Sequence, residues 1–314
     1  MGRKLIVAVL CGGPSSEYEV SLNSGRNVFK FIDRKKFLPT LVILQKDFSL
    51  RIGSQTLPFP SGLRRFDVVF NALHGQFGED GVLQSILDLI RIPYTGSDTA
   101  SSFIGMDKWL SKLFFNKSGL VVPSSRLFKQ KEFPEKVKFP LVAKPRRGGS
   151  SVGVELIYSR KQLKKTFEKI WKSGDDVILE RYIRGRELTV GVIEKKGKII
   201  SLPVIEIVPK KRHKFFDYQA KYLPGHSDEI VPAPISRSLA GRLQRSAIQA
   251  HKSLECSVYS RSDFMVLGKK IYILEVNTLP GLTQNSLVPK AAQAAGMSFG
   301  DLITLIIKSS LERF

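Results

Sequence analysis

The chain has 314 residues, 42% of them hydrophobic and 25% charged, which is enough to bury a globular core divided among about two or three domains. No apolar run reaches the length that a membrane span requires, so an integral membrane protein is excluded. The net charge of +22 by itself favours nucleic acid or another polyanion as a partner, although the basic residues are dispersed along the chain.

The first hundred residues alternate between strand-like and helix-like segments. Strands are predicted at residues 5–10, 41–44 and 68–73, and helices at residues 21–32 and 82–90. This rhythm is typical of a parallel sheet with helices on its faces.

The rest of the chain is predicted to form two α+β blocks. The first begins near Met106 and contains a helix at 109–117, a strand at 141–144 and a helix at 160–173. The second contains strands at 187–193 and 199–208, a helix at 237–254, a strand hairpin and a last helix at 299–311.

The two cysteines indicate a reducing compartment. Cys11 lies at the end of the first apolar strand, and Cys256 follows a helical pattern. They offer neither a disulfide framework nor the spacing of a zinc site. We therefore expect two core thiols and a cytoplasmic protein.

The hairpin contains the most informative residues. Asp263 lies in a strand-like run, and Glu275 and Asn277 lie two residues apart in the next one, so both face the same side. With a three-residue turn centred on Lys269, Asp263 would lie opposite Glu275. Like charges in that arrangement destabilise a strand pair, and a Mg²⁺ or Mn²⁺ ion would neutralise them. A two-residue turn would instead direct Asp263 away from Glu275.

Five further segments each allow two interpretations. Lys144 precedes a Gly/Ser-rich turn that suits phosphate, or is a plain hairpin loop. Glu180 ends a strand, where it suits a nucleoside or is merely solvated. Glu17 begins a helix, where it either interacts with the helix dipole or binds an ammonium group. His74 follows a buried strand, where a structural role is the alternative. The basic run at 210–214 is either a localisation signal or a solvated loop beside a nucleotide site.

Several segments, taken in their order along the chain, resemble D-alanine–D-alanine ligases of the ATP-grasp superfamily. They are GGPSSEYEVS (12–21), HGQFGEDG (74–81), MDK (106–108), KPRRGGSSVG (144–153), FFDYQAKY (215–222), SRSDF (260–264) and EVNTLPGLTQNSLVP (275–289). The resemblance covers essentially the whole chain. It implies an α/β and α+β ATP-grasp fold with a Rossmann-like substrate domain (1–104), a central domain (105–186) and a C-terminal domain carrying metal and catalytic residues (187–314).

The resemblance also implies an ATP site between the central and C-terminal domains. Its ATP-binding residues would be Lys108, Lys144, Ser151, Glu180, Ile183, Glu187 and Lys221. Two Mg²⁺ or Mn²⁺ ions would be held by Asp263, Glu275 and Asn277, the three residues that the hairpin indicates independently.

The implied reaction joins two D-alanines for peptidoglycan precursor synthesis. The carboxylate of the first attacks the γ-phosphate of ATP to give an acyl phosphate, which the amine of the second then attacks. By resemblance, the catalytic residues would be Glu17, Ser150, Tyr222, Arg261 and Gly281. The substrate-binding residues would be Glu17, His74, Ser286 and Leu287.

Two alternatives stay open. A related ATP-grasp ligase would make D-alanyl-D-lactate or D-alanyl-D-serine, although Tyr222 favours D-alanine as second substrate. A polyanion-binding protein without catalysis would explain the charge, but every implied ligand position is filled. We therefore expect ATP and D-alanine as partners, no nucleic acid and no membrane, and a homodimer as in related ligases.

Overall fold

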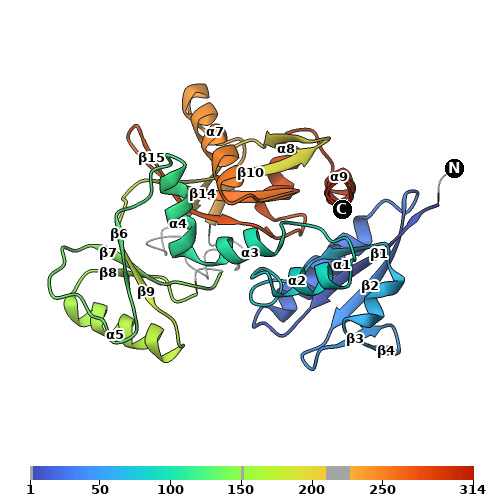
Figure 1. Ribbon diagram of the computed structural model, residues 1–314. Coiled ribbons are helices and arrows are strands. Elements are labelled where there is room, and N and C mark those ends of the chain that lie inside the picture. The colour runs from blue at the N-terminus through green and yellow to red at the C-terminus, as the bar shows by residue number, and fades with distance from the viewer. Residues whose placement is uncertain (1–2, 150–151, 210–226) are drawn as a thin grey trace.

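The computed structural model of the protein describes residues 3–149, 152–209 and 227–314. Within these ranges the strands form three sheets, each with helices packed against it (Figure 1). The N-terminal sheet lies beside the third sheet and away from the second, and helices α3 (Thr99–Met106) and α4 (Lys108–Lys117) follow it along the chain.

The first sheet has the strand order β4-β3-β2-β1-β5. Its elements are β1 (Leu5–Gly12), α1 (Tyr18–Phe31), β2 (Phe37–Leu44), β3 (Ser49–Ile52), β4 (Gln55–Pro58), the 3₁₀ helix η1 (Ser61–Arg65), β5 (Val68–Asn71) and α2 (Val82–Leu89). β1 pairs in parallel with both β2 and β5, so the predicted parallel sheet is confirmed. The β3–β4 hairpin at its edge was not predicted.

The second sheet is antiparallel, with the order β6-β9-β7-β8. Its elements are β6 (Ser125–Phe128), β7 (Leu141–Pro145), β8 (Glu155–Ile157), α5 (Arg160–Lys172) and β9 (Val177–Arg181). Phe167 of α5 is fully buried and packs edge-on against Phe128 and Trp171. This sheet therefore has a core of its own.

The third sheet has the order β13-β12-β10-β14-β15, with β11 also on β10. Its elements are β10 (Arg186–Lys195), β11 (Lys198–Ser201), β12 (Ile205–Pro209), β13 (Ser227–Ile230), α7 (Arg237–Ser253), β14 (Tyr259–Leu267), β15 (Lys270–Asn277), α8 (Leu287–Ala294) and α9 (Phe299–Leu311). The prediction of one strand at 199–208 was wrong. The chain leaves the ladder between β11 and β12 around Pro203, which has no N–H to donate.

Helix α9 connects the first sheet with the third. Ile303 and Ile307 are fully buried in one core together with Val9 of β1 and Ile193 of β10. Just beyond the helix, Arg313 donates hydrogen bonds to the Gly96 carbonyl and the Ser257 hydroxyl, both at 2.9 Å. The two sheets therefore share buried contacts rather than a loose linker.

Both cysteines are core thiols, as predicted. Cys11 lies in β1 and Cys256 follows α7, and both are buried and free. Burial raises the pKa of each thiol to about 12. Such thiols are protonated and weakly nucleophilic.

Within the described residues, no single helix is long and apolar enough to cross a membrane. Only α8 and α9 taken together reach that length and composition, and they are bent by 106° at the break between them.

The linker between the second and third sheets makes a close backbone contact. A Cβ added at Gly185 would lie 2.8 Å from the carbonyl carbon of Val266 in β14 and closer still to its oxygen. Gly185→Ala must push the linker away from β14, and we expect it to destabilise the protein by about 1–3 kcal/mol in denaturant unfolding.

The matched control is the same change inside α7. At Gly241 the nearest atom to an added Cβ is an Arg245 guanidinium nitrogen at 3.4 Å, which can move. Gly241→Ala should stabilise the protein by about 0.5–1 kcal/mol through helix propensity. Equal effects of the two changes would contradict the close contact at Gly185.

Candidate active site

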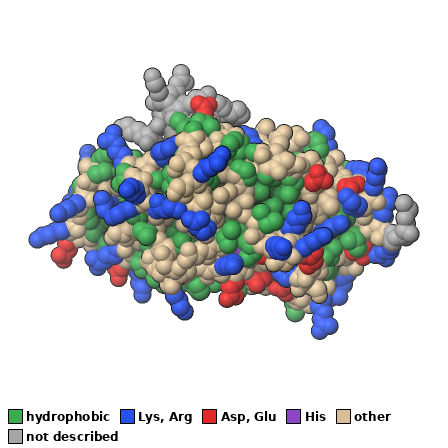
Figure 2. Space-filling model, turned by 90° about the horizontal axis from the view of Figure 1, so that it is seen from above, with side chains coloured by type: hydrophobic (Ala, Val, Ile, Leu, Met, Phe, Trp, Pro, Cys, Tyr) green, Lys and Arg blue, Asp and Glu red, His purple; other side chains and the backbone are tan. Residues whose placement is uncertain are grey.

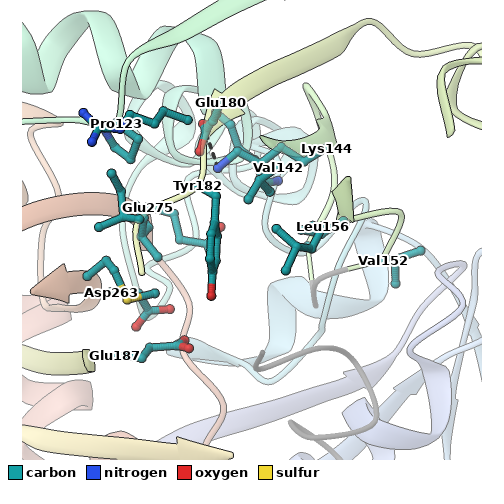
Figure 3. A pocket seen from close by; sticks show the side chains of 17 residues that line it. Pro123, Val142, Lys144, Val152, Leu156, Glu180, Tyr182, Glu187, Asp263 and Glu275 are labelled. Carbon is teal, nitrogen blue, oxygen red and sulfur yellow. Dashed lines mark ion pairs between the residues drawn. The ribbon is translucent and has the colours of Figure 1, made fainter. Parts of the chain in front are cut away.

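A pocket opens between the second and third sheets (Figure 3). It is lined by Lys108, Pro123, Val142, Lys144, Gly149, Val152, Val154, Leu156, Glu180, Arg181, Tyr182, Ile183, Glu187, Asp263, Met265, Leu274 and Glu275. Strands β7, β8 and β9 supply one wall, and β10, β14 and β15 supply the other. The pocket therefore brings together side chains that are far apart in the sequence.

The middle of the pocket is apolar and its two ends are charged. Val142 and Leu156 face the ring of Tyr182 across the opening, and Met265 and Leu274 line the same space. Glu180 and Lys144 lie at one end, while Asp263 and Glu187 lie toward the other. An apolar slot with polar groups at its ends suits a flat aromatic ring that carries a charged tail.

One end is built around a buried carboxylate. Oε1 of Glu180 lies 2.9 Å from the Lys144 ammonium and 2.8 Å from that of Lys112. Burial alone would raise the pKa of the Glu180 carboxyl, but the two lysine charges lower it below its usual value. Burial lowers the pKa of Lys112 to about 8 against the attraction of Glu180.

Lys112 was missed in the sequence analysis. It lies on α4 one turn after Lys108, and residues four apart share a face of a helix. That spacing was the available signal. A lysine within a helix is ordinarily a solvated residue, however, and nothing local indicates that only 2% of Lys112 is exposed.

At the other end of the pocket Asp263 lies opposite Glu275 as predicted, but a different turn and an irregularity in the strand produce this register. The turn has two residues, because Leu267 pairs with Lys270, and the three-residue turn was therefore wrong. An irregularity next to Asp263 then inserts Leu274 into β15, which restores the pairing of Asp263 with Glu275. The expectation that a two-residue turn directs Asp263 away from Glu275 was wrong for the same reason.

Asp263 is neutralised here by a neighbouring side chain. The Arg261 guanidinium binds both its carboxylate oxygens, at 2.9 and 2.8 Å, and the Thr189 hydroxyl donates to Oδ1 at 2.6 Å. The resemblance implied Arg261 for an oxyanion, and in this structure its guanidinium is engaged by Asp263.

The donor set fits a hard divalent cation. Asp263 and Glu275 both line the pocket, and Asn277 lies two residues further along β15. The Asn277 Oδ1 accepts a hydrogen bond from the Leu279 N–H at 2.9 Å, and an amide oxygen has a second lone pair. Carboxylate and amide oxygens are the ligands that Mg²⁺ and Mn²⁺ prefer.

Lys108 is brought to the Gly-rich segment by the start of α4. The Asp107 side chain caps the helix by accepting from the backbone N–H groups of Trp109 and Leu110, and it also pairs with Arg146 at 2.7 Å. The Lys108 ammonium donates to the Gly148 carbonyl. Lys108 and Lys144 therefore line one pocket, as a nucleotide site requires.

A second group of predicted residues lies where the first and third sheets meet. The Glu17 carboxylate lies over Gly75, and the His74 ring lies 3.7 Å from the Cβ position of Gly281. His74 is held by Ser24 at 2.8 Å and Glu79 at 3.3 Å.

The segment after Gly281 leads into α8. Ser286 is the N-cap of that helix, and its hydroxyl lies 3.3 Å from the Cβ position of Gly281. Leu287 is the first residue of the helix. Ser150, Ser151, Lys221 and Tyr222 lie outside the described residues.

Comparisons with known proteins agree with this geometry. The family described as "D-ala D-ala ligase N-terminus" matches residues 45–97, and that described as "D-ala D-ala ligase C-terminus" matches residues 115–308. The chain belongs to the D-alanine–D-alanine ligase family. Its ATP-grasp fold, expected from the sequence, is thereby confirmed.

Individual members of the family match over almost their full length. The D-alanine–D-alanine ligases of Syntrophobacter fumaroxidans and Halalkalibacterium halodurans are both 39% identical, over 98% of this chain and 98% and 99% of theirs. The solved ligase of Bacillus anthracis complexed with ATP is 34% identical, with a TM-score of 0.84 over 99% of this chain and 98% of that one.

The metal assignment predicts the behaviour of one conservative variant. Glu275→Gln keeps the shape of the side chain and removes its charge, so Mn²⁺ should bind at least about tenfold more weakly in the presence of ADP. Titration followed by electron paramagnetic resonance measures this directly.

The matched control for that titration is the exposed Glu255, which lies outside the pocket. Glu255→Gln should bind Mn²⁺ as the unaltered protein does. Undiminished Mn²⁺ binding by a folded Glu275→Gln variant would refute the assignment.

Proposed function

We propose that this chain is an ATP-dependent ligase that joins two D-alanines into D-alanyl-D-alanine for peptidoglycan precursor synthesis. The observation that carries the proposal is the pocket between the second and third sheets, where buried Lys144 and Glu180 lie at one end and Asp263 and Glu275 pair at the other. Family membership over nearly the whole chain supports the same reaction.

ATP would place its base in the apolar slot and its phosphates toward the carboxylate end. Glu180 and Ile183 would contact the base, Glu187 would contact the ribose, and Lys108 the phosphates. The resemblance implied phosphate binding for Lys144 as well, but its ammonium lies beside Glu180, at the end that would hold the base. Asp263, Glu275 and Asn277 would hold two Mg²⁺ or Mn²⁺ ions, which supply positive charge against the phosphate oxygens. Ser151 and Lys221 complete the set proposed from the resemblance.

The first D-alanine would bind near the junction of the first and third sheets. The Glu17 carboxylate is suited to its ammonium group, and His74 to orienting it. Its carboxylate attacks the γ-phosphorus and the bond to ADP breaks, which yields an acyl phosphate. Ser150 and Tyr222 would close the site over this intermediate and exclude water.

The second D-alanine would bind at the start of α8. Ser286 and Leu287 lie at that N-terminus, where backbone N–H groups and the helix dipole favour a carboxylate. Its amine attacks the acyl carbon, and phosphate leaves with its oxygen. Arg261 and the Gly281 N–H would stabilise the tetrahedral oxyanion between these events.

A second candidate differs only in the second substrate. The solved VanG D-Ala:D-Ser ligase of Enterococcus faecalis is 31% identical, with a TM-score of 0.87 over 98% of this chain and 100% of that one. A depsipeptide or D-alanyl-D-serine product is therefore the alternative to test beside D-alanine.

We also propose that the enzyme works in the cytoplasm, where ATP is available, and that nucleic acid is not a partner. The dispersal of its basic side chains supports the second point. On the face shown in Figure 2, Lys and Arg are scattered among hydrophobic and neutral side chains.

The three domains proposed from the resemblance are residues 1–104, 105–186 and 187–314.

The reaction predicts a coupled nucleotide signal. ADP should be released when ATP, Mg²⁺ and D-alanine are all present, and D-alanyl-D-alanine should form in equal amount. L-alanine should give no product. Mass spectrometry of products formed with D-alanine alone, or with added D-serine or D-lactate, separates the two candidates. Absence of turnover with D-alanine alone would overturn the first.

The proposed homodimer gives a separate prediction. Leu89 of α2 is 82% exposed and Phe103 of the adjacent α3 is 51% exposed, and a second copy would cover such side chains. Light scattering should give about twice the chain mass of 35.2 kDa. Leu89→Glu should shift that mass toward the monomer, whereas a monomeric unaltered protein would contradict the proposal.

A further inference from the structure

We infer that Lys112 is a positioning residue for the nucleotide base: from behind the pocket it holds Glu180 as an ionised acceptor and so selects a 6-amino over a 6-oxo purine. The inference rests on the nucleotide site proposed above. It adds a residue that does not itself line that site.

Lys112 is a buried charge with one evident role. It is 2% exposed, and its ammonium lies 2.8 Å from Oε1 of Glu180. Its neighbour one turn earlier, Lys108, lines the pocket, whereas Lys112 lies behind it. A buried ammonium requires a compensating charge, and Glu180 provides it.

Two lysines share one oxygen of Glu180. Lys144 lies 2.9 Å from the same Oε1, and within the described part of the chain no ion pair uses Oε2. Glu180 and Lys144 both line the pocket, so both can meet a ligand there. The unused oxygen of an ionised carboxylate accepts hydrogen bonds and cannot donate them.

This pair of groups matches one edge of adenine. Adenine presents an amino donor at C6 beside an acceptor at N7, whereas a 6-oxo purine presents acceptors at both positions. Glu180 would accept from the amino group while Lys144 donates to N7. A 6-oxo group would instead face the carboxylate, acceptor against acceptor.

Removing Lys112 should weaken this selection through Glu180. The charged groups near the carboxyl are Lys112 from α4 and Lys144 from β7, while Glu275 at the far end acts on Lys112. Without Lys112, burial is opposed by Lys144 alone, and the pKa of Glu180 rises. A protonated carboxyl can donate to a 6-oxo group, so selection should fail most at low pH.

The test is calorimetric binding of ADP and IDP with Mg²⁺, without D-alanine. The unaltered protein should prefer ADP by about 100-fold or more. Lys112→Met should reduce that preference to about tenfold or less at the low end of the pH range, with partial recovery as the pH is raised and Glu180 loses its proton. Lys117→Met, at an exposed position of the same helix, should behave as the unaltered protein.

Three other results would each overturn the inference. One is an unaltered preference in a folded Lys112→Met protein, since a purely structural ion pair would not change the ratio. Another is a loss independent of pH, and a third is no preference in the unaltered protein. If Lys112→Met does not fold, Lys112→Gln replaces it with the same expected ratio. The titration contains no D-alanine, so its outcome does not depend on whether the protein joins two D-alanines. Failure of the ligase reaction would be detected in the separate product assay.

Discussion

The site depends on two carboxylates that face each other across one strand pair. Asp263 and Glu275 share a register position, which like charges disfavour unless something positive lies between or beside them. In this structure Arg261 provides that charge for Asp263. The inserted Leu274 keeps both acids on the pocket side, so the irregularity in β15 is part of the site.

At the opposite end of the pocket the charge balance is reversed. There a single buried carboxylate, Glu180, lies between Lys112 and Lys144, and the excess charge is positive. The two ends come from different sheets with separate cores, joined by the linker at Gly185. Nucleotide binding therefore depends on how closely those sheets approach each other.

Residues of the first sheet do not line the pocket. The first sheet is instead joined to the third sheet by a shared hydrophobic core. Helix α9 buries Ile303 and Ile307 against both the first and third sheets. Where the two sheets meet, the His74 ring lies beside Gly281, and the proposed chemistry assigns these residues to the first substrate and to the oxyanion. The carboxylate end of the pocket and the proposed D-alanine site are therefore both carried by sheets that share one hydrophobic core.

Local pattern by itself determined the parallel β1, β2 and β5 and most of the helices, because alternation and apolar periodicity depend on near neighbours. It did not predict the short helices α3 and α8. The metal trio of Asp263, Glu275 and Asn277 also came from local pattern, and it stays a prediction. Segment order along the chain determined the family. Only the tertiary structure decided the turn length and the bulge at Leu274, since strand register is set by both strands together. It alone decided that Lys112 is buried against Glu180, because a helix position becomes interior only when another element covers it.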